Sequence, residues 1–343
     1  LDIFDDISRK TPNICKLSPA GTQHIEDLHR AGGIPAVMAA LLYTGSLTRQ
    51  VTNMLIPTAV YIVMAVSLNL VVGLLGELSL GHAGFMSVGL FSGCLVAIAL
   101  TNTALPLMVR LPVSMLAGGL TAAVFGLLVG LPTLRLRGDY LAIVTLACGE
   151  IIKNIITNLN ITGGALGLDT SSIYAGAKDL LPYGALLVLL TVAVMLNLKR
   201  SKYGRAIMAI RDNRIAAESV GLSVTRYKLA VFVIAAFFAG CAGVLYGHSL
   251  ANIKAAAFDY NMSIEILVIV VLGGMGSVPG SVISAIVLTV LPEALREVAD
   301  YRMLVYAIVL ILVMQATNNP TMKRFFASAK EKLTPGRKER AAL

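Results

Sequence analysis

The sequence predicts an all-α fold, that of a polytopic helical membrane protein with about nine transmembrane helices, one of them a broken or re-entrant segment. Hydrophobic residues make up 57% of the 343 residues and charged residues only 14%, whereas soluble proteins carry about 25% charged residues. The apolar residues gather in runs about as long as a membrane-spanning helix, and the basic residues gather between those runs. This pattern excludes an ordinary soluble protein, and it leaves no soluble domain that could present the basic residues to nucleic acid.

Nine apolar runs account for the predicted helices, since a crossing needs about 20 mostly apolar residues. The runs are 51–72, 78–100, 112–131, 140–159, 181–198, 229–250, 264–272, 281–295 and 303–316. The seventh run is short and leads into the glycine-rich segment 273–280, which reads GGMGSVPG. We therefore expect the broken or re-entrant segment there, buried within the protein, because lipid cannot satisfy exposed backbone groups.

The basic residues between and after the runs predict the topology. Eight lysines and arginines lie in 199–228 and seven follow Thr317, and such clusters remain on the cytoplasmic side of a membrane. We therefore predict a transmembrane domain over 42–322 with a cytoplasmic loop at 199–228. A basic tail at 323–343 follows, so that the C-terminus is cytoplasmic. The segment 160–180 carries a single lysine and should face the outside.

On a helix, the loop segment 203–228 separates apolar from charged residues. The apolar stripe consists of Ala206, Ile207, Ile210, Ala217 and Val220. The other face carries Arg205, Arg211, Asp212, Arg214 and Glu218. Arg214 and Glu218 are four residues apart and should form an ion pair, and Gly221 should end the helix. Such an amphipathic helix either lies on anionic lipid or docks into a groove of a partner protein.

Ionisable residues inside the runs need polar surroundings, because an ionised side chain at the bilayer centre costs about 2.5–3.5 kcal/mol. Glu150 and Lys153 lie three residues apart, hence on one helix face, and they either pair with each other or line a polar path. His82 follows Gly81 in an apolar run, where a hydrogen-bonded packing histidine is favoured over a substrate ligand. No second residue at ligand spacing accompanies it, so we expect no metal site.

A series of glycines between and within the first two runs allows two interpretations. They are Gly73, Gly76, Gly81, Gly84 and Gly89. A helix could break near the membrane midplane and offer its N–H groups to a carboxylate, or helices could pack closely on the glycines, which is the interpretation that we favour. The motifs GxxxxGK[ST], GxSxG and HExxH are absent, so we expect no catalytic residue and no nucleotide bound by this chain.

The basic loop resembles the coupling loop of permease subunits in the ABC importers for branched-chain amino acids. The matching residues are Gly204, Arg205, Ala206, Ala209, Ile210, Arg211, Asn213, Ala216, Ala217, Glu218, Gly221, Tyr227 and Lys228. Arg214 replaces an acidic residue that is usual in that pattern, so a contact made there could differ. Five further segments match in the same order, namely 76–89, 137–150, 161–167, 232–246 and 273–280. The resemblance covers about 54–315.

The resemblance implies a permease subunit of the plasma (inner) membrane that forms a translocation path for leucine, isoleucine or valine and is not itself an enzyme. ATP and Mg²⁺ would be bound by two partner ABC ATPase subunits that dock on the loop. A second permease subunit and an extracytoplasmic amino-acid-binding protein would complete the transporter, with no nucleic acid. Candidate residues of the path are His82, Glu150, Lys153, Gly163 and Gly164. A urea or short-amide permease of the same superfamily, or a secondary transporter, remains the alternative.

Residues 1–41 are polar and contain no membrane span. They resemble an internal segment of the dihydroxy-acid dehydratases, with CKLSPAG, EDL and AGGIPAV in the same order. About 40 residues cannot carry that enzyme's fold, because burying a core needs a longer chain. We interpret the segment as a foreign fragment from fusion or misassembly rather than a native leader. We expect no activity from it, and it stands where the family normally has an additional span.

Overall fold

A computed structural model describes residues 49–101, 106–134, 136 and 138–294. Within these ranges, seven helical segments are long and apolar enough to cross a membrane; the seventh is Ala255–Gly273, which includes a 3₁₀ turn, and an eighth apolar helix, Val278–Pro292, is shorter. The all-α prediction is therefore confirmed, since the strands described amount to one pair of two-residue segments. The leader 1–41, the run 303–316 and the tail 323–343 fall outside the described residues, so the predicted count of nine helices stays a prediction.

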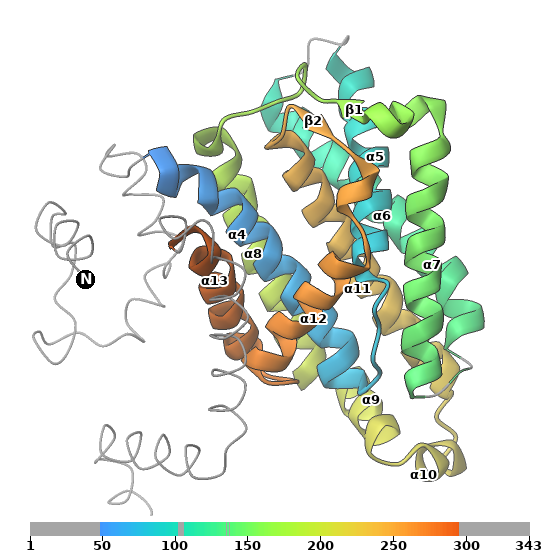
Figure 1. Ribbon diagram of the computed structural model, residues 1–343. Helices are drawn as coiled ribbons and strands as arrows, with labels where there is room; N and C mark the ends of the chain where they lie inside the picture. The colour runs from blue at the N-terminus through green and yellow to red at the C-terminus, as the bar shows by residue number, and fades with distance from the viewer. Residues whose placement is uncertain (1–48, 102–105, 135, 137, 295–343) are drawn as a thin grey trace, which may run out of the picture.

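The helices follow the predicted runs with shifts of a few residues at their ends. They are α4 (Arg49–Asn69), α5 (His82–Thr101), α6 (Leu107–Thr133), α7 (Asp139–Asn158), α8 (Ala177–Arg200), α9 (Lys202–Asp212), α10 (Arg214–Ser219), α11 (Val224–His248), α12 (Tyr260–Gly273) and α13 (Val278–Ala294). In Figure 1 the long helices run between two ends of the molecule. One end carries α9 and α10, and the other carries the strands β1 (Leu168–Asp169) and β2 (Asn252–Ile253).

The centre of the bundle is the place where α5, α6 and α11 meet. Their backbones approach each other at Gly89, Gly118 and Gly240, which we call the glycine seam. A methyl group on Gly240 would lie 2.7 Å from the carbonyl oxygen of Gly118, and one on Gly89 would lie 2.7 Å from that of Gly240. Real side chains do not come so close, so only glycine permits this contact, as expected where membrane helices pack tightly.

The chain is not continuously helical between α4 and α5. α4 continues into one π-helical segment, Leu70–Leu75, which ends at Gly76 with φ +76°. Residues 76–81 are then non-helical until α5 begins at His82. Close packing explains some of these glycines but not all of them. Gly76 ends a helix. Gly84 is a packing glycine, because a methyl group added to it would lie 2.9 Å from the α carbon of Gly149.

Another break lies between α11 and α12. It contains β2 and one 3₁₀ turn, Ala255–Ala257, before Asp259 caps α12. The glycine-rich segment, where we predicted a break, is a tight turn at 274–277 between α12 and α13, in which Gly274 and Gly276 have positive φ. The side chain of Asn69 on α4 binds the backbone of this turn. Met275 is nevertheless 65% exposed and the other three turn residues are only half-buried, which corrects the expectation that this segment is buried within the protein.

The loop at 159–176 is attached to the segment that follows α11. It contains two 3₁₀ turns, Asn160–Thr162 and Gly164–Leu166, and then β1, which pairs antiparallel with β2 so that Leu168 lies opposite Ile253. The backbone N–H of Ala175 also donates to the carbonyl of His248 at 3.0 Å. Two chain segments that are about 80 residues apart are thus joined at this end of the bundle.

Candidate functional site

The predicted amphipathic helix of the basic loop is two helices. α9 begins after Ser201, whose Oγ accepts a hydrogen bond from the N–H of Gly204 at 3.1 Å. It ends at Asp212, and Asn213 caps α10 by accepting from the N–H of Ala216 at 3.1 Å. Because Asn213 takes an extended conformation, the helical periodicity is interrupted there, although Ile210 of α9 and Ala217 of α10 still pack in one apolar cluster.

The division of the loop decides which apolar residues are buried. Ile207, Ile210 and Ala217 are buried, as predicted, and Ala206 is half-buried. Val220 is 76% exposed, which corrects its place in the predicted stripe: α10 ends at Ser219, so Val220 no longer follows the helical periodicity.

Gly221 ends the helix as expected, with φ +85°. The N–H of Leu222 donates to the carbonyl of Ala217 at 3.1 Å, a bond typical of a helix end with a left-handed glycine. The predicted pair of Arg214 and Glu218 is also present, at 2.8 Å between Nε and Oε1. Both side chains are exposed to solvent by a third or more, so the pair contributes about 0.3–0.5 kcal/mol.

Arg211 connects α9 to the end of α4. Its Nη1 donates to the carbonyl oxygen of Gly73 at 3.0 Å, and its aliphatic stem lies against Gly76. The carbonyl groups in the last turn of a helix lack partners within the helix, and the chain after Gly76 does not continue the helix. The guanidinium therefore satisfies a backbone acceptor that the break at Gly76 leaves free.

Two more side chains attach the turn 274–277 to the same place. Asn69 accepts from the N–H of Gly276 at 2.7 Å and donates to the carbonyl of Ser277 at 3.1 Å. Lys199, in the last turn of α8, donates to the carbonyl of Gly276 at 2.8 Å. The ends of α4 and α8 thus both hold the backbone of the turn between α12 and α13.

A buried ion pair lies beside these contacts. The ammonium of Lys228, near the start of α11, pairs with the carboxylate of Glu77, which follows α4. The side chains are 7% and 13% exposed. Sequence reasoning missed this pair because the two residues are 151 positions apart. We call the whole set the α9 junction; it comprises Asn69, Gly73, Glu77, Lys199, Arg211, Lys228 and the turn 274–277.

Glu150 and Lys153 form the ion pair expected from their spacing. The carboxylate of Glu150 also accepts a hydrogen bond from the backbone N–H of Tyr260 at 2.9 Å, at the start of α12. Both side chains are partly accessible, Glu150 at 27% and Lys153 at 19%. The ion-pair interpretation is thus confirmed, while a role in a translocation path stays a prediction.

His82 is buried at the first position of α5. Its Nε2 lies 2.8 Å from the Oγ of Ser67 on α4. The next N–H, that of Ala83, donates to the Oγ of Ser263 on α12 at 3.2 Å. The side chain of His82 faces packed protein, which supports the packing interpretation over a substrate ligand.

Gly163 and Gly164 shape the loop after α7. They have φ of +77° and +59°, and they lie past the end of α7 rather than beside Glu150. Further along this loop, the carboxylate of Asp169 accepts a hydrogen bond from the N–H of Ser171 at 2.9 Å. That bond holds the pKa of Asp169 below its ordinary value.

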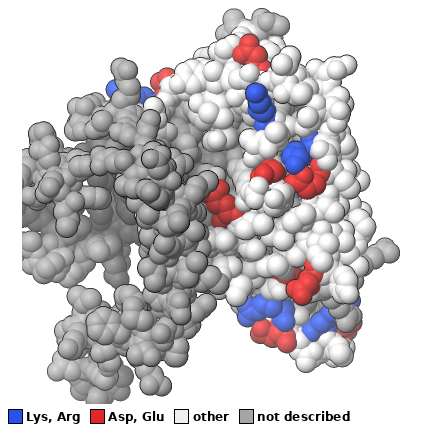
Figure 2. Space-filling model, viewed as in Figure 1, with Lys and Arg blue, Asp and Glu red and all other residues white. Residues whose placement is uncertain are grey.

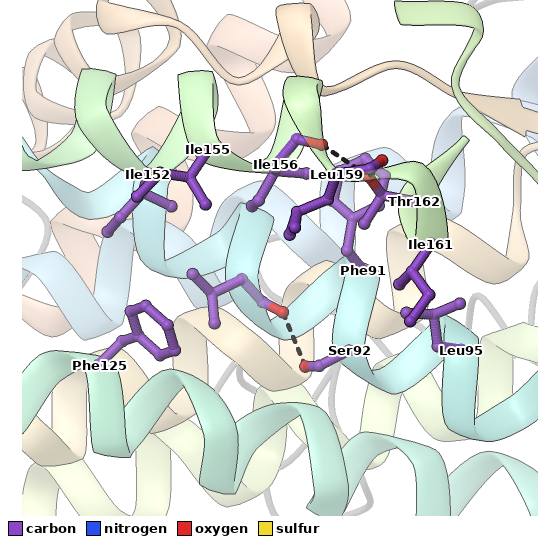
Figure 3. Close-up of a pocket in the computed structure, with 11 residues that line it drawn as sticks. Phe91, Ser92, Leu95, Phe125, Ile152, Ile155, Ile156, Leu159, Ile161 and Thr162 are labelled. Carbon is purple, nitrogen blue, oxygen red and sulfur yellow. Dashed lines mark hydrogen bonds between the residues drawn. The ribbon is translucent and has the colours of Figure 1, made fainter. Parts of the chain in front are cut away.

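A cavity of about 180 Å³ lies between α5, α6, α7 and the loop after α7. Figure 3 shows it lined by aliphatic and aromatic side chains, among them Phe91, Phe125 and Ile155. The hydroxyls of Ser92 and Thr162 turn away from it to the backbone carbonyls of Val88 and Ile156, at 2.7 and 2.6 Å. The cavity is therefore suited to an apolar group. Sequence reasoning did not predict it, because its lining comes from four separate elements.

Comparisons with known proteins divide the chain into two parts. The sequence model of a family described as "Branched-chain amino acid transport system / permease component" matches residues 50–314, and that of "Dihydroxy-acid/6-phosphogluconate dehydratase N-terminal" matches residues 1–59. The chain is similar to the high-affinity branched-chain amino acid transport system permease proteins LivM of Salmonella typhimurium and Escherichia coli. The identities are 38% over 296 residues and 36% over 314 residues.

These two alignments cover 75% and 82% of the chain, and the chain spans 66% and 72% of the lengths of these relatives. A dihydroxy-acid dehydratase of Oleidesulfovibrio alaskensis is 74% identical over 49 residues, which are 14% of this chain and 9% of that enzyme. The predicted likeness of the leader is thus confirmed, and its origin by fusion or misassembly stays a prediction. No solved structure matches the chain.

Proposed function

Because this chain belongs to the family of permease components of branched-chain amino acid transport systems, we propose that it is the transmembrane permease subunit of an ATP-binding-cassette importer for leucine, isoleucine and valine. The chain is a multi-pass membrane protein, with seven long apolar helices among its described residues. In this proposal it forms part of the translocation path in the inner membrane, and the ATP chemistry takes place on separate subunits.

The observation that carries the proposal is the pair of short helices α9 and α10 at one end of the bundle. They present Tyr203 and Ile215, which are 65% and 80% exposed, and Val220, which directly follows α10, is 76% exposed. Large apolar side chains exposed on a charged helix pair favour docking into a groove of a protein partner. The helix pair is also attached to the membrane-spanning part through the hydrogen bond from Arg211 to Gly73. A partner that moves α9 would therefore displace the end of α4 as well.

The proposal assigns a partner to each end of the molecule. Two ABC ATPase subunits, which bind ATP and Mg²⁺, would dock on α9 and α10 of this chain and its partner permease, and that end would face the cytoplasm together with the C-terminal tail. An extracytoplasmic amino-acid-binding protein would deliver the substrate at the end that carries β1 and β2. Alternating access would follow from rocking the two permease subunits.

The experiment that tests this is uptake of labelled leucine into membrane vesicles. The chain is co-expressed with the ATPase, the second permease and the binding protein, and uptake is measured with and without ATP. Uptake that needs ATP and disappears when the ATPase is omitted supports the importer. Uptake that persists without the ATPase indicates a secondary transporter, and ATP-dependent uptake of urea in place of leucine indicates a short-amide permease.

A further inference from the structure

One face of the bundle carries charge in the middle of a membrane-spanning helix. The rise of 1.5 Å per residue places Glu150 about 16 Å from Asp139 at one end of α7 and about 12 Å from Asn158 at the other. The hydrocarbon core of a bilayer is about 30 Å thick. In Figure 2 acidic and basic side chains gather on this face at mid-height, away from the charged ends of the molecule.

The face continues from α7 onto the start of α12. The bond from the N–H of Tyr260 to Glu150 joins the two helices. Tyr260 is 49% exposed, Asn261 is exposed, and the Nδ2 of Asn261 donates to Asp259 at 2.6 Å. We call this set, Glu150, Lys153, Asp259, Tyr260 and Asn261, the α7–α12 face.

Other exposed helix surfaces of the bundle are different. On α6 and α8 the exposed positions at mid-helix include Leu116, Leu120, Val124, Leu186, Leu189 and Leu190. No charged residue occurs in 111–131 or in 180–198. Those surfaces suit lipid, whereas an ionised side chain at the bilayer centre costs about 2.5–3.5 kcal/mol unless it faces protein or water.

We propose that the α7–α12 face is where this chain meets a second permease chain of the same fold, an inference that rests on the proposed function. The charges argue for this occupant. Glu150 and Lys153 present opposite signs one helical turn apart, so a partner of the same fold, related by an approximate two-fold axis, can place its basic group near Glu150 and its acidic group near Lys153. A face that carries both signs is self-complementary under such an axis.

The test is site-specific photo-crosslinking in the assembled transporter within its membrane. A photoreactive amino acid replaces Ile151, which neighbours the ion pair on α7 and is 56% exposed, and, as the matched control, Leu120 on α6, which is 60% exposed. We expect position 151 to form an adduct with the second permease and position 120 to form adducts with lipid alone. The proposal is overturned if position 151 forms adducts with lipid alone, or with an ATPase or a binding protein. It is also overturned if position 120 forms an adduct with the second permease.

A second measurement separates contact from charge complementarity. In E150Q/K153M the glutamine can still accept from Tyr260, so the link between α7 and α12 is kept while both charges are removed. We expect at least about tenfold less second permease to co-purify with this variant. No change is expected for K178M/D179N, which removes two exposed opposite charges at the start of α8. If as much second permease co-purifies with E150Q/K153M as with the unchanged chain, the ion pair acts only within this chain and does not bind the second permease. Since neither readout requires uptake, a cross-link at 151 without leucine uptake would preserve the interface and refute the importer.

Discussion

The glycine seam and the α9 junction both hold helices together, but they are built from different residue types. At the seam, Gly89, Gly118 and Gly240 bring three backbones into contact without a polar side chain. At the junction, the guanidinium of Arg211 and the amide of Asn69 bind backbone groups, and Lys228 pairs with Glu77. These contacts join four helices and a turn. Close-packed backbone has one arrangement and resists displacement, whereas hydrogen bonds of long side chains can break and reform. We therefore expect α5, α6 and α11 to move as one rigid body, and relative motion to be concentrated where α9 meets α4.

The largest expected effect comes from breaking the buried ion pair of the junction. Glu77→Gln leaves the ammonium of Lys228 without its counter-charge in a site that is 7% exposed, and losing one partner of a buried pair costs about 3–5 kcal/mol. The free energy of unfolding, measured in mixed detergent micelles, should fall by that amount. The double variant E77Q/K228M should recover most of the loss. If it is as unstable as Glu77→Gln alone, the loss does not come from leaving the ammonium of Lys228 buried without a counter-charge.

A smaller loss is expected at the glycine seam. Gly240→Ala places a methyl 2.7 Å from the carbonyl oxygen of Gly118, and forcing helices apart in a packed core costs about 1–3 kcal/mol. Gly176→Ala is the matched control, because φ there is −66° and the nearest atom lies 3.6 Å from the added methyl. Equal melting temperatures for the two variants in detergent would contradict the conclusion that only glycine fits at position 240.

Arg211→Met sharpens the comparison, because it removes a link rather than a packing contact. One hydrogen bond contributes about 0.5–1.5 kcal/mol to stability, so the variant should fold. In the assembled transporter it should lower leucine uptake by about two- to thirtyfold, as expected for a residue that carries 0.5–2 kcal/mol of coupling, while ATP hydrolysis continues. Arg205→Met is the control, because Arg205 lies exposed on the same helix and its Nη1 donates to the carbonyl of Arg200 instead of to α4. Normal uptake by Arg211→Met would show that the hydrogen bond to Gly73 does not couple movement of α9 to α4.

The smallest effect on stability is expected for Ile215→Asp. The side chain is 80% exposed, and substitutions at such positions change stability by about 0.5 kcal/mol or less. Recovery of the ATPase with the permease should nevertheless fall at least fivefold, as for an apolar contact worth over about 1 kcal/mol. Ile207→Asp, in the same pair of helices but 2% exposed, should instead lower the melting temperature. Full ATPase recovery with Ile215→Asp would place the docking surface elsewhere.

The long helices could be predicted from the sequence, because membrane spans are a property of local composition. The pair of Glu150 and Lys153 was predictable for a similar reason, since its residues lie on one turn. The split between α9 and α10 also has a local signal: asparagine is a strong N-cap residue, and Asn213 stands where the second helix starts.

The α9 junction could not be predicted in this way. Arg211 binds a backbone carbonyl, a group that every residue carries, and the pairing of Glu77 with Lys228 depends on how α4 and α11 pack. The break at 76–81 was one of two interpretations of the same glycines. The structure shows a break and close packing at different positions: Gly76 has a positive φ, whereas Gly84 and Gly89 meet neighbouring backbones. That the break lies at the membrane midplane and binds a carboxylate stays a prediction.

The pairing of β1 with β2 has a consequence for events at that end of the molecule. The loop 159–176 is fixed there by the strand pair, by the bond from Ala175 to His248, and by the hydroxyl of Thr170, which donates to the carbonyl of Leu250 at 2.6 Å. Ordering a free backbone costs about 1–2 kcal/mol per residue, and this loop is already ordered before any protein approaches. A partner that docks on it therefore meets a preorganised surface, so association should be fast and its rate should depend little on the conformation of the loop.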